Sequence, residues 1–191
     1  MRDLFKTTEE KGRVTGKMEM RVLDKNGNPK QLWDENRLGR FLRSKGGLSL
    51  QGVPFLGKWA ETKSLENLVV DAGLAGIASR INGAGAEAVF EYLAVGSGTT
   101  SPVDGDTALE AEIATGGASR AAATTSRETT NVSDDTAVLD YTWSITAALS
   151  ITEAGALNDT SSGVLLGRQV FSAVNVSDGD SFQLTYKFTA S

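Results

Sequence analysis

The stretch that decides the fold is Thr136 to Ile151, TAVLDYTWSITAALSI. Every odd-numbered position in it is apolar, and the even-numbered positions are mostly Asp, Ser and Thr. A period of two over this length is typical of a strand with one buried and one solvated face, whereas helical spacing would scatter the same residues around a cylinder. We therefore predict a β protein built around one long central strand.

Other stretches repeat this pattern on a smaller scale. We expect further strands at 14–22, 88–95, 118–130, 164–176 and 182–190. The Asn-Gly pair within Asp24–Asn28 and the Asp-Gly pair within Ser177–Asp180 are strong signals for tight turns. Several strands separated by Gly, Asp and Asn turns predict a mainly β fold, an antiparallel β-sandwich or jelly roll.

One short helix is expected in addition to the strands. Apolar residues lie near helical spacing between Asn67 and Asn82. Asn67 is a suitable N-cap, and Gly83 is suitable for the left-handed residue that follows a helix. Gly73 and Gly76 weaken the helix, because glycine loses more backbone entropy than other residues on ordering.

The N-terminal third differs from the rest of the chain. Residues 36–66 show no strand periodicity, and a long connection without regular structure is usually functional. We therefore divide the chain into residues 1–66, a first strand with a basic arm or insert that makes assembly contacts, and residues 67–191, the β-sandwich body.

Aromatic and cationic residues alternate in this insert. The candidate interface residues are Arg37, Arg40, Phe41, Arg43, Phe55 and Trp59. One interpretation is that the three rings fold back and fill one end of the sandwich. The other is that they dock, with the arginines, into another subunit, because aromatic residues and Arg are enriched at protein interfaces.

Composition argues against catalysis. The 191-residue chain has neither Cys nor His, which removes the usual nucleophile, general base and metal ligands. We predict no enzyme activity, no catalytic residues, no cofactor and no metal site. No apolar run reaches the length needed to span a bilayer, and the N-terminus lacks the apolar core of a signal peptide. The chain is expected to be made in the cytoplasm without a membrane partner.

Three local motifs invite a functional interpretation. Asp24, Asn26, Asn28 and Glu35 follow calcium-loop spacing, but Pro29 stands where that loop needs Gly, so a hairpin turn is expected. The Gly96-Ser-Gly98 loop lacks the third glycine and the helix of a phosphate-binding loop. Glu153 and Arg168 can form a buried pair with a structural role.

Charge divides along the same boundary as the expected domains. Residues 1–66 carry a net charge of +5 and residues 67–191 a net charge of −10. Such a weak basic excess favours docking of the arm on an acidic protein surface over binding to nucleic acid.

Several short segments of the sequence resemble segments of known proteins. They are Asn67–Gly73 (NLVVDAG), Tyr92–Thr100 (YLAVGSGTT), Asp106–Glu110 (DTALE), Ile151–Gly155 (ITEAG), Gly163–Arg168 (GVLLGR) and the closing alternating strand. In this order they resemble a family of tailed-bacteriophage virion structural proteins, β-sandwich modules of head-decoration, minor tail or tail-fibre proteins. The resemblance covers about 67–190 and the first strand. The chain departs from the family in its long insert and in lacking an aromatic residue after Gly155.

The resemblance implies a non-enzymatic protein present in many copies in a virion, often as trimers. We expect a capsid decoration (cement) or minor capsid protein that contacts copies of itself and another virion protein, such as the major capsid protein. The alternatives are a tail-fibre or baseplate module for attachment and, from another class, a carbohydrate-binding or carbohydrate-cleaving sandwich.

Overall fold

The computed structural model describes residues 14–46, 51–85 and 87–190. The N-terminal segment that we tested for a signal peptide lies outside these ranges. In the first half of the described chain the elements are β1 (Val14–Leu23), β2 (Leu32–Glu35), α1 (Arg37–Gly46), β3 (Gly57–Ala60), β4 (Thr62–Val69), α2 (Asp71–Asn82) and β5 (Tyr92–Gly96). In the second half they are β6 (Ala121–Ala122), β7 (Thr124–Glu128), β8 (Thr136–Ser144), β9 (Leu149–Leu157), β10 (Leu165–Val176) and β11 (Ser181–Ala190).

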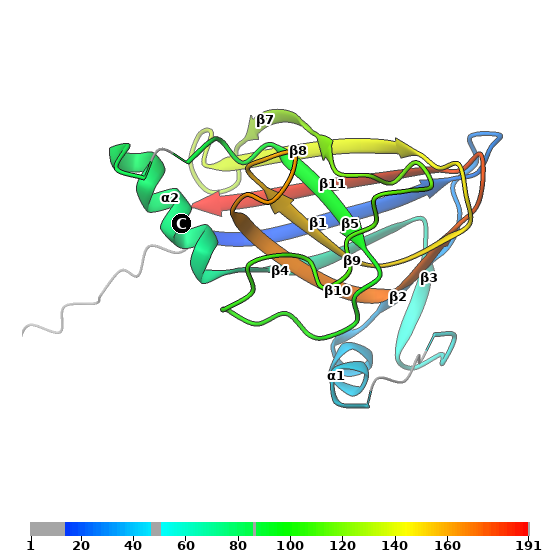
Figure 1. The fold of residues 1–191 in the computed structure, drawn as a ribbon. Coiled ribbons are helices and arrows are strands. Elements are labelled where there is room, and N and C mark those ends of the chain that lie inside the picture. The colour runs from blue at the N-terminus through cyan, green and yellow to red at the C-terminus, as the bar shows by residue number, and fades with distance from the viewer. Residues whose placement is uncertain (1–13, 47–50, 86, 191) are drawn as a thin grey trace, which may run out of the picture.

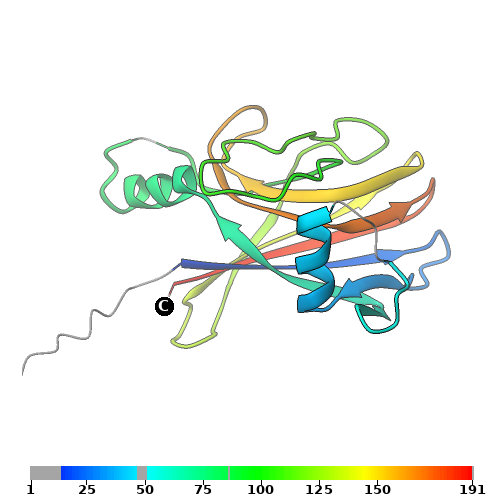
Figure 2. The ribbon, with the colours of Figure 1, turned by 90° about the horizontal axis from the view of Figure 1, so that it is seen from below.

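Nine strands form one antiparallel sheet in the order β6-β5-β9-β10-β4-β1-β11-β8-β7. The sheet curls nearly into a barrel, as Figures 1 and 2 show. Its two edges are joined by one stretch of chain, because β6 pairs with β5 and β7, which follows after Ala123, pairs with β8. The mainly β, antiparallel prediction is confirmed. The expected two-layered sandwich or jelly roll is wrong, because this stretch draws the edges of a single twisted sheet together.

The predicted long central strand is two strands, β8 and β9, separated by a turn at residues 145–148. Backbone hydrogen bonds hold the turn, from the N–H of Ile145 to the carbonyl of Asp180 and from the N–H of Thr146 to the carbonyl of Gly116. The apolar alternation continues through the turn because Ile145 and Ile151 both lie in the core. Periodicity alone therefore could not reveal the break.

The expected strands at the two ends of the chain are confirmed. They are β1 and β11, which pair along their whole length, from Val14 opposite Ala190 to Leu23 opposite Ser181. Their inward side chains lie in the barrel interior with those of the other strands. The main core contains Met18, Met20, Val22, Leu65, Leu93, Val95, Leu139, Trp143, Phe171, Phe182, Leu184 and Tyr186. The Tyr186 hydroxyl donates a hydrogen bond of 2.8 Å across this interior to the carbonyl of Ala154.

The insert expected to lack regular structure contains α1, β3 and β4. β4 lies at the centre of the nine-stranded sheet and spans the boundary that we expected after residue 66. Strands β2 and β3 form a separate two-stranded ribbon, with α1 between them in the chain. The described residues therefore contain two helices, not the single helix that we expected.

The predicted helix is α2, which begins at Asp71 rather than after Asn67. Asn67 is a residue of β4, whereas Gly83 ends the helix in the left-handed conformation, as predicted. Gly73 and Gly76 form the buried face of α2. A side chain at Gly73 would place its Cβ 2.3 Å from the carbonyl oxygen of Leu166 in β10, so the glycines allow the helix to lie directly on the sheet.

Candidate functional site

Helix α1 presents its apolar stripe to solvent. Leu38, Phe41 and Leu42 stand at positions i, i+3 and i+4, and their exposed fractions are 49%, 56% and 39%. A helix on the surface of a globular protein normally turns such a stripe toward the core. The opposite face of α1, with Gly39, Arg40 and Arg43, lies against the protein instead. The amphipathic helix is therefore inverted.

Polar contacts explain the inversion. Arg43 donates from Nε to Glu35 Oε2 at 2.9 Å and from a terminal nitrogen to the carbonyl of Val170 at 3.1 Å. Arg40 donates to the carbonyl of Glu35 at 2.9 Å. Glu35 is 2% exposed, so its charge is buried and needs this pairing. The arginines fix the underside of α1, and the apolar stripe is left on the outside.

Two aromatic residues in the segment after α1 are also exposed. Phe55 is 70% exposed and Trp59 is 52% exposed. The Trp59 ring packs edge-on against Trp33 with ring centroids 5.4 Å apart, and Asn36 donates to the carbonyl of Phe55 at 2.7 Å. We call Leu38, Phe41 and Leu42 of α1 the docking face, and Phe55 and Trp59 are separate exposed rings in the segment that follows the helix. In Figure 1 α1 and β3 project from the lower side of the barrel.

The six predicted interface residues fall into two groups. Phe41, Phe55 and Trp59 are exposed, so the interpretation that these rings fill one end of the fold is wrong. Arg37 is also exposed, whereas Arg40 and Arg43 anchor α1 from below. Our candidate set omitted Leu38 and Leu42, although their helical spacing with Phe41 is visible in the sequence.

A buried lysine fills the gap between β4 and β10. These strands pair at only two positions, Gly167 with Val69 and Arg168 with Leu68. Beyond them Lys63, which is 1% exposed, donates from Nζ to the hydroxyl of Ser172 and lies 5.6 Å from the centroid of the Phe171 ring. Burial lowers the pKa of Lys63 to about 8, although the nearby Glu35 carboxylate opposes the shift. Sequence reasoning missed this residue.

The stability of the fold should rise with pH in the range where Lys63 loses its proton. The pKa of Lys63 is lowered from 10.5 to about 8 in the folded protein. Between these values the unfolded chain holds a proton that the folded protein does not, so this group adds stability as pH rises, by at most about 1.4 kcal/mol per pH unit. Denaturant unfolding from pH 7 to 10.5 should show this rise in wild type relative to Lys63→Met. Parallel stability curves for the two proteins would contradict the prediction.

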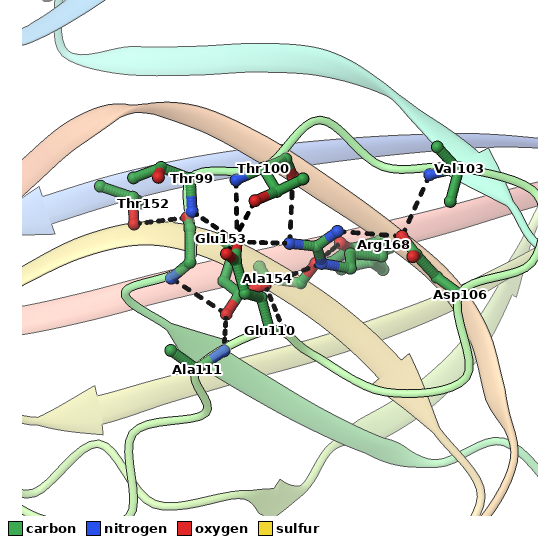
Figure 3. A network of polar contacts seen from close by, with 12 residues as sticks. Thr99, Thr100, Val103, Asp106, Glu110, Ala111, Thr152, Glu153, Ala154 and Arg168 are labelled. Atoms are coloured by element: carbon green, nitrogen blue, oxygen red, sulfur yellow. Dashed lines mark hydrogen bonds and ion pairs between the residues drawn. The ribbon is translucent and has the colours of Figure 1, made fainter. Parts of the chain in front are cut away.

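Figure 3 shows a second polar network, centred on the predicted pair of Glu153 and Arg168. The pair is confirmed as buried, with 2.7 Å between Arg168 Nε and Glu153 Oε2 and side-chain exposures of 3% and 0%. Glu153 also accepts hydrogen bonds from the backbone N–H groups of Gly98, Glu110 and Ala111. Arg168 further contacts Asp106 at 2.9 Å. The network fixes the connection between β5 and β6 to the outer face of the sheet.

One groove on the molecule has a volume of about 1360 Å³. Residues of β1, β4, α1 and α2 line it, among them Lys17, Glu66, Arg37 and Leu74, and none of the lining residues is aromatic. Proteins that bind sugars commonly stack them on aromatic rings, so this groove gives no support to the carbohydrate-binding alternative. In the described ranges no group of three or more His, Cys, Asp or Glu side chains could hold a metal ion.

The described part of the chain includes no helix long and apolar enough to cross a membrane. Comparison with known proteins finds no matching family model, no similar curated protein and no similar solved structure.

Proposed function

We propose that this chain is a non-enzymatic structural protein of a tailed-bacteriophage virion, a capsid decoration protein that attaches to another virion protein through the docking face. The inverted helix α1 carries this proposal. Leu38, Phe41 and Leu42 are each about half exposed, so a partner that buries the remainder gains about 0.7–1.5 kcal/mol for each side chain. Exposed apolar patches of this kind mark sites of protein association.

The chemistry of the partner follows from the rim of the docking face. The exposed side chain of Arg37 is next to Leu38 in the chain, and the first 66 residues have a net charge of +5. Such a surface fits an apolar depression with acidic residues around it. On a virion, the major capsid protein is the partner that we propose.

The assignment to a phage virion rests on the sequence resemblance. The segments that carry the resemblance include residues with a structural role in the fold. Glu153 and Arg168 belong to two of these segments, and Gly73 belongs to a third. The docking face lies in the insert, outside these segments. We therefore propose that the barrel is the part shared with the family and that the insert provides this protein's own attachment.

Shells prepared without this protein would test the proposal. The triple variant Leu38→Ser, Phe41→Ser, Leu42→Ser should bind to shells at least about 100-fold more weakly than wild type, because three apolar anchors are lost. A matched control is Leu74→Ser, Ile81→Ser, since both residues are exposed on α2, at 46% and 83%. Co-sedimentation at graded concentrations measures the affinity. Equal binding of the triple variant and wild type would refute the proposal, and binding to isolated tails instead of shells would favour the tail alternative.

A further inference from the structure

Strand β3 has an open edge, and hydrogen bonds on β2 show which residues of β3 present their backbone N–H and C=O groups to it. The carbonyl of Trp33 accepts from the Ser172 hydroxyl at 3.2 Å, and that of Glu35 accepts from Arg40 at 2.9 Å. Both carbonyls therefore point away from β3. In an antiparallel pair, hydrogen-bonded and non-hydrogen-bonded residue pairs alternate. Trp33 lies opposite Trp59, and Glu35 lies opposite Gly57. The backbone N–H and C=O groups of Trp59 and Gly57 therefore point away from β2, toward the open edge of β3.

Strand β7 is a second open edge, at the other side of the molecule. Within the described ranges β3 pairs only with β2, and β7 pairs only with β8. All residues of β7, Thr124–Glu128, are exposed. Figure 1 shows β7 along the upper side of the barrel and β3 below it, so the two edges of one chain cannot meet. Open edges of this kind are templates for pairing between chains.

The charges on the two edges are complementary. Lys58 is exposed on β3, and Glu128 of β7 has a side chain that is 48% exposed. An antiparallel register that places Lys58 opposite Glu128 also places Trp59 opposite Arg127, an arrangement that suits a cation–π contact. The parts of the chain that carry these edges have opposite net charges, +5 for residues 1–66 and −10 for residues 67–191.

We propose that β3 of one copy pairs with β7 of a second copy, so that copies of this chain join head to tail. The surfaces in such a contact differ, so repetition produces a closed ring or an open filament. The contact goes beyond the proposed attachment to a shell, because it joins copies of the chain to one another. It leaves α1, with Leu38, Phe41 and Leu42, available for the shell.

Charge reversal tests this pairing in solution. Sedimentation velocity of the full chain at low salt should show association that rises with concentration. Lys58→Glu and Glu128→Lys should each weaken association about tenfold or more, because like charges then face each other, and the double variant should recover it. Lys25→Glu, an equal charge change in the exposed turn after β1, is the control and should associate as wild type does.

Three results would overturn the inference. They are a wild-type chain that stays monomeric at every concentration, single reversals that associate as strongly as wild type, and a double variant that does not recover. Circular dichroism of each variant separates loss of association from loss of folding. The pair between Glu128 and Lys187 that is lost in Glu128→Lys lies at the surface, where such pairs contribute little stability, whereas Lys58→Glu places a carboxylate opposite Asp34. Shell binding through α1 is measured separately, so failure of one proposal is distinguishable from failure of the other.

Discussion

Replacing Glu153 with Ala should lower the free energy of unfolding by about 3–5 kcal/mol, the cost of removing one member of a buried ion pair. The substitution removes the 2.7 Å contact with Arg168, whose side chain is 3% exposed and cannot reach water without rearrangement. It also deprives the N–H groups of Gly98, Glu110 and Ala111 of their acceptor. The connection between β5 and β6 should then detach from the sheet before the barrel unfolds.

Denaturant unfolding followed by circular dichroism measures the loss, and hydrogen exchange at residues 97–112 reports the detachment. The matched control is Glu19→Ala, which removes a partly exposed carboxylate from a 2.8 Å surface pair with Lys17. Exposed pairs are worth about 0–1 kcal/mol, so this control should unfold nearly as wild type does. A cost below about 1 kcal/mol for Glu153→Ala would show that the network does not hold the connection in place.

Gly73→Val should destabilise the protein by about 3 kcal/mol, at the upper end for overpacking a buried contact. A Cβ at this position would lie 2.3 Å from the carbonyl oxygen of Leu166, and that carbonyl accepts a hydrogen bond from the N–H of Val70. The obstacle is backbone within β10, so α2 must move away from the sheet. The movement would separate Gly76 from the Phe90 ring, the next contact along the helix.

Thermal unfolding compares this variant with Gly105→Ala, where an added Cβ meets no atom within 4 Å. The control should change the free energy of unfolding by no more than about 0.5 kcal/mol, as is usual for surface substitutions. If Gly73→Val unfolded at the wild-type temperature, close packing of α2 on β10 would not be a condition of the fold.

The sequence could predict the strands whose inward residues are all apolar. In β11 Phe182, Leu184, Tyr186 and Phe188 alternate with polar residues, and the expected strand matches the observed one. In β4 the inward positions include Lys63 and Asn67, because part of this strand faces the polar gap beside β10. No apolar alternation results, so the central strand of the sheet was assigned to a structureless insert.

The candidate site was predictable in its composition but not in its orientation. The three rings stand out in the sequence because they cluster in a segment without strand periodicity. The direction of α1 depends on Glu35, and the sequence does not show that this carboxylate is buried beneath the helix. Once Arg40 and Arg43 are bound near Glu35, the position of Leu38 and Leu42 on the outer face follows from helical geometry.

The sparse pairing of β4 with β10 determines how force would travel through the protein. Among the described residues, a pull on α1 reaches β10 only through side-chain contacts, such as those that Arg43 and Ser172 make. It reaches β1 along the chain in both directions, through β2 on one side and through β3 and the six residue pairs between β4 and β1 on the other. Individual side-chain contacts can break one at a time, but a ladder of backbone bonds resists shear as a unit. Under tension the β10 side of the barrel would yield first, while the β1 side kept the attached helix connected to the body.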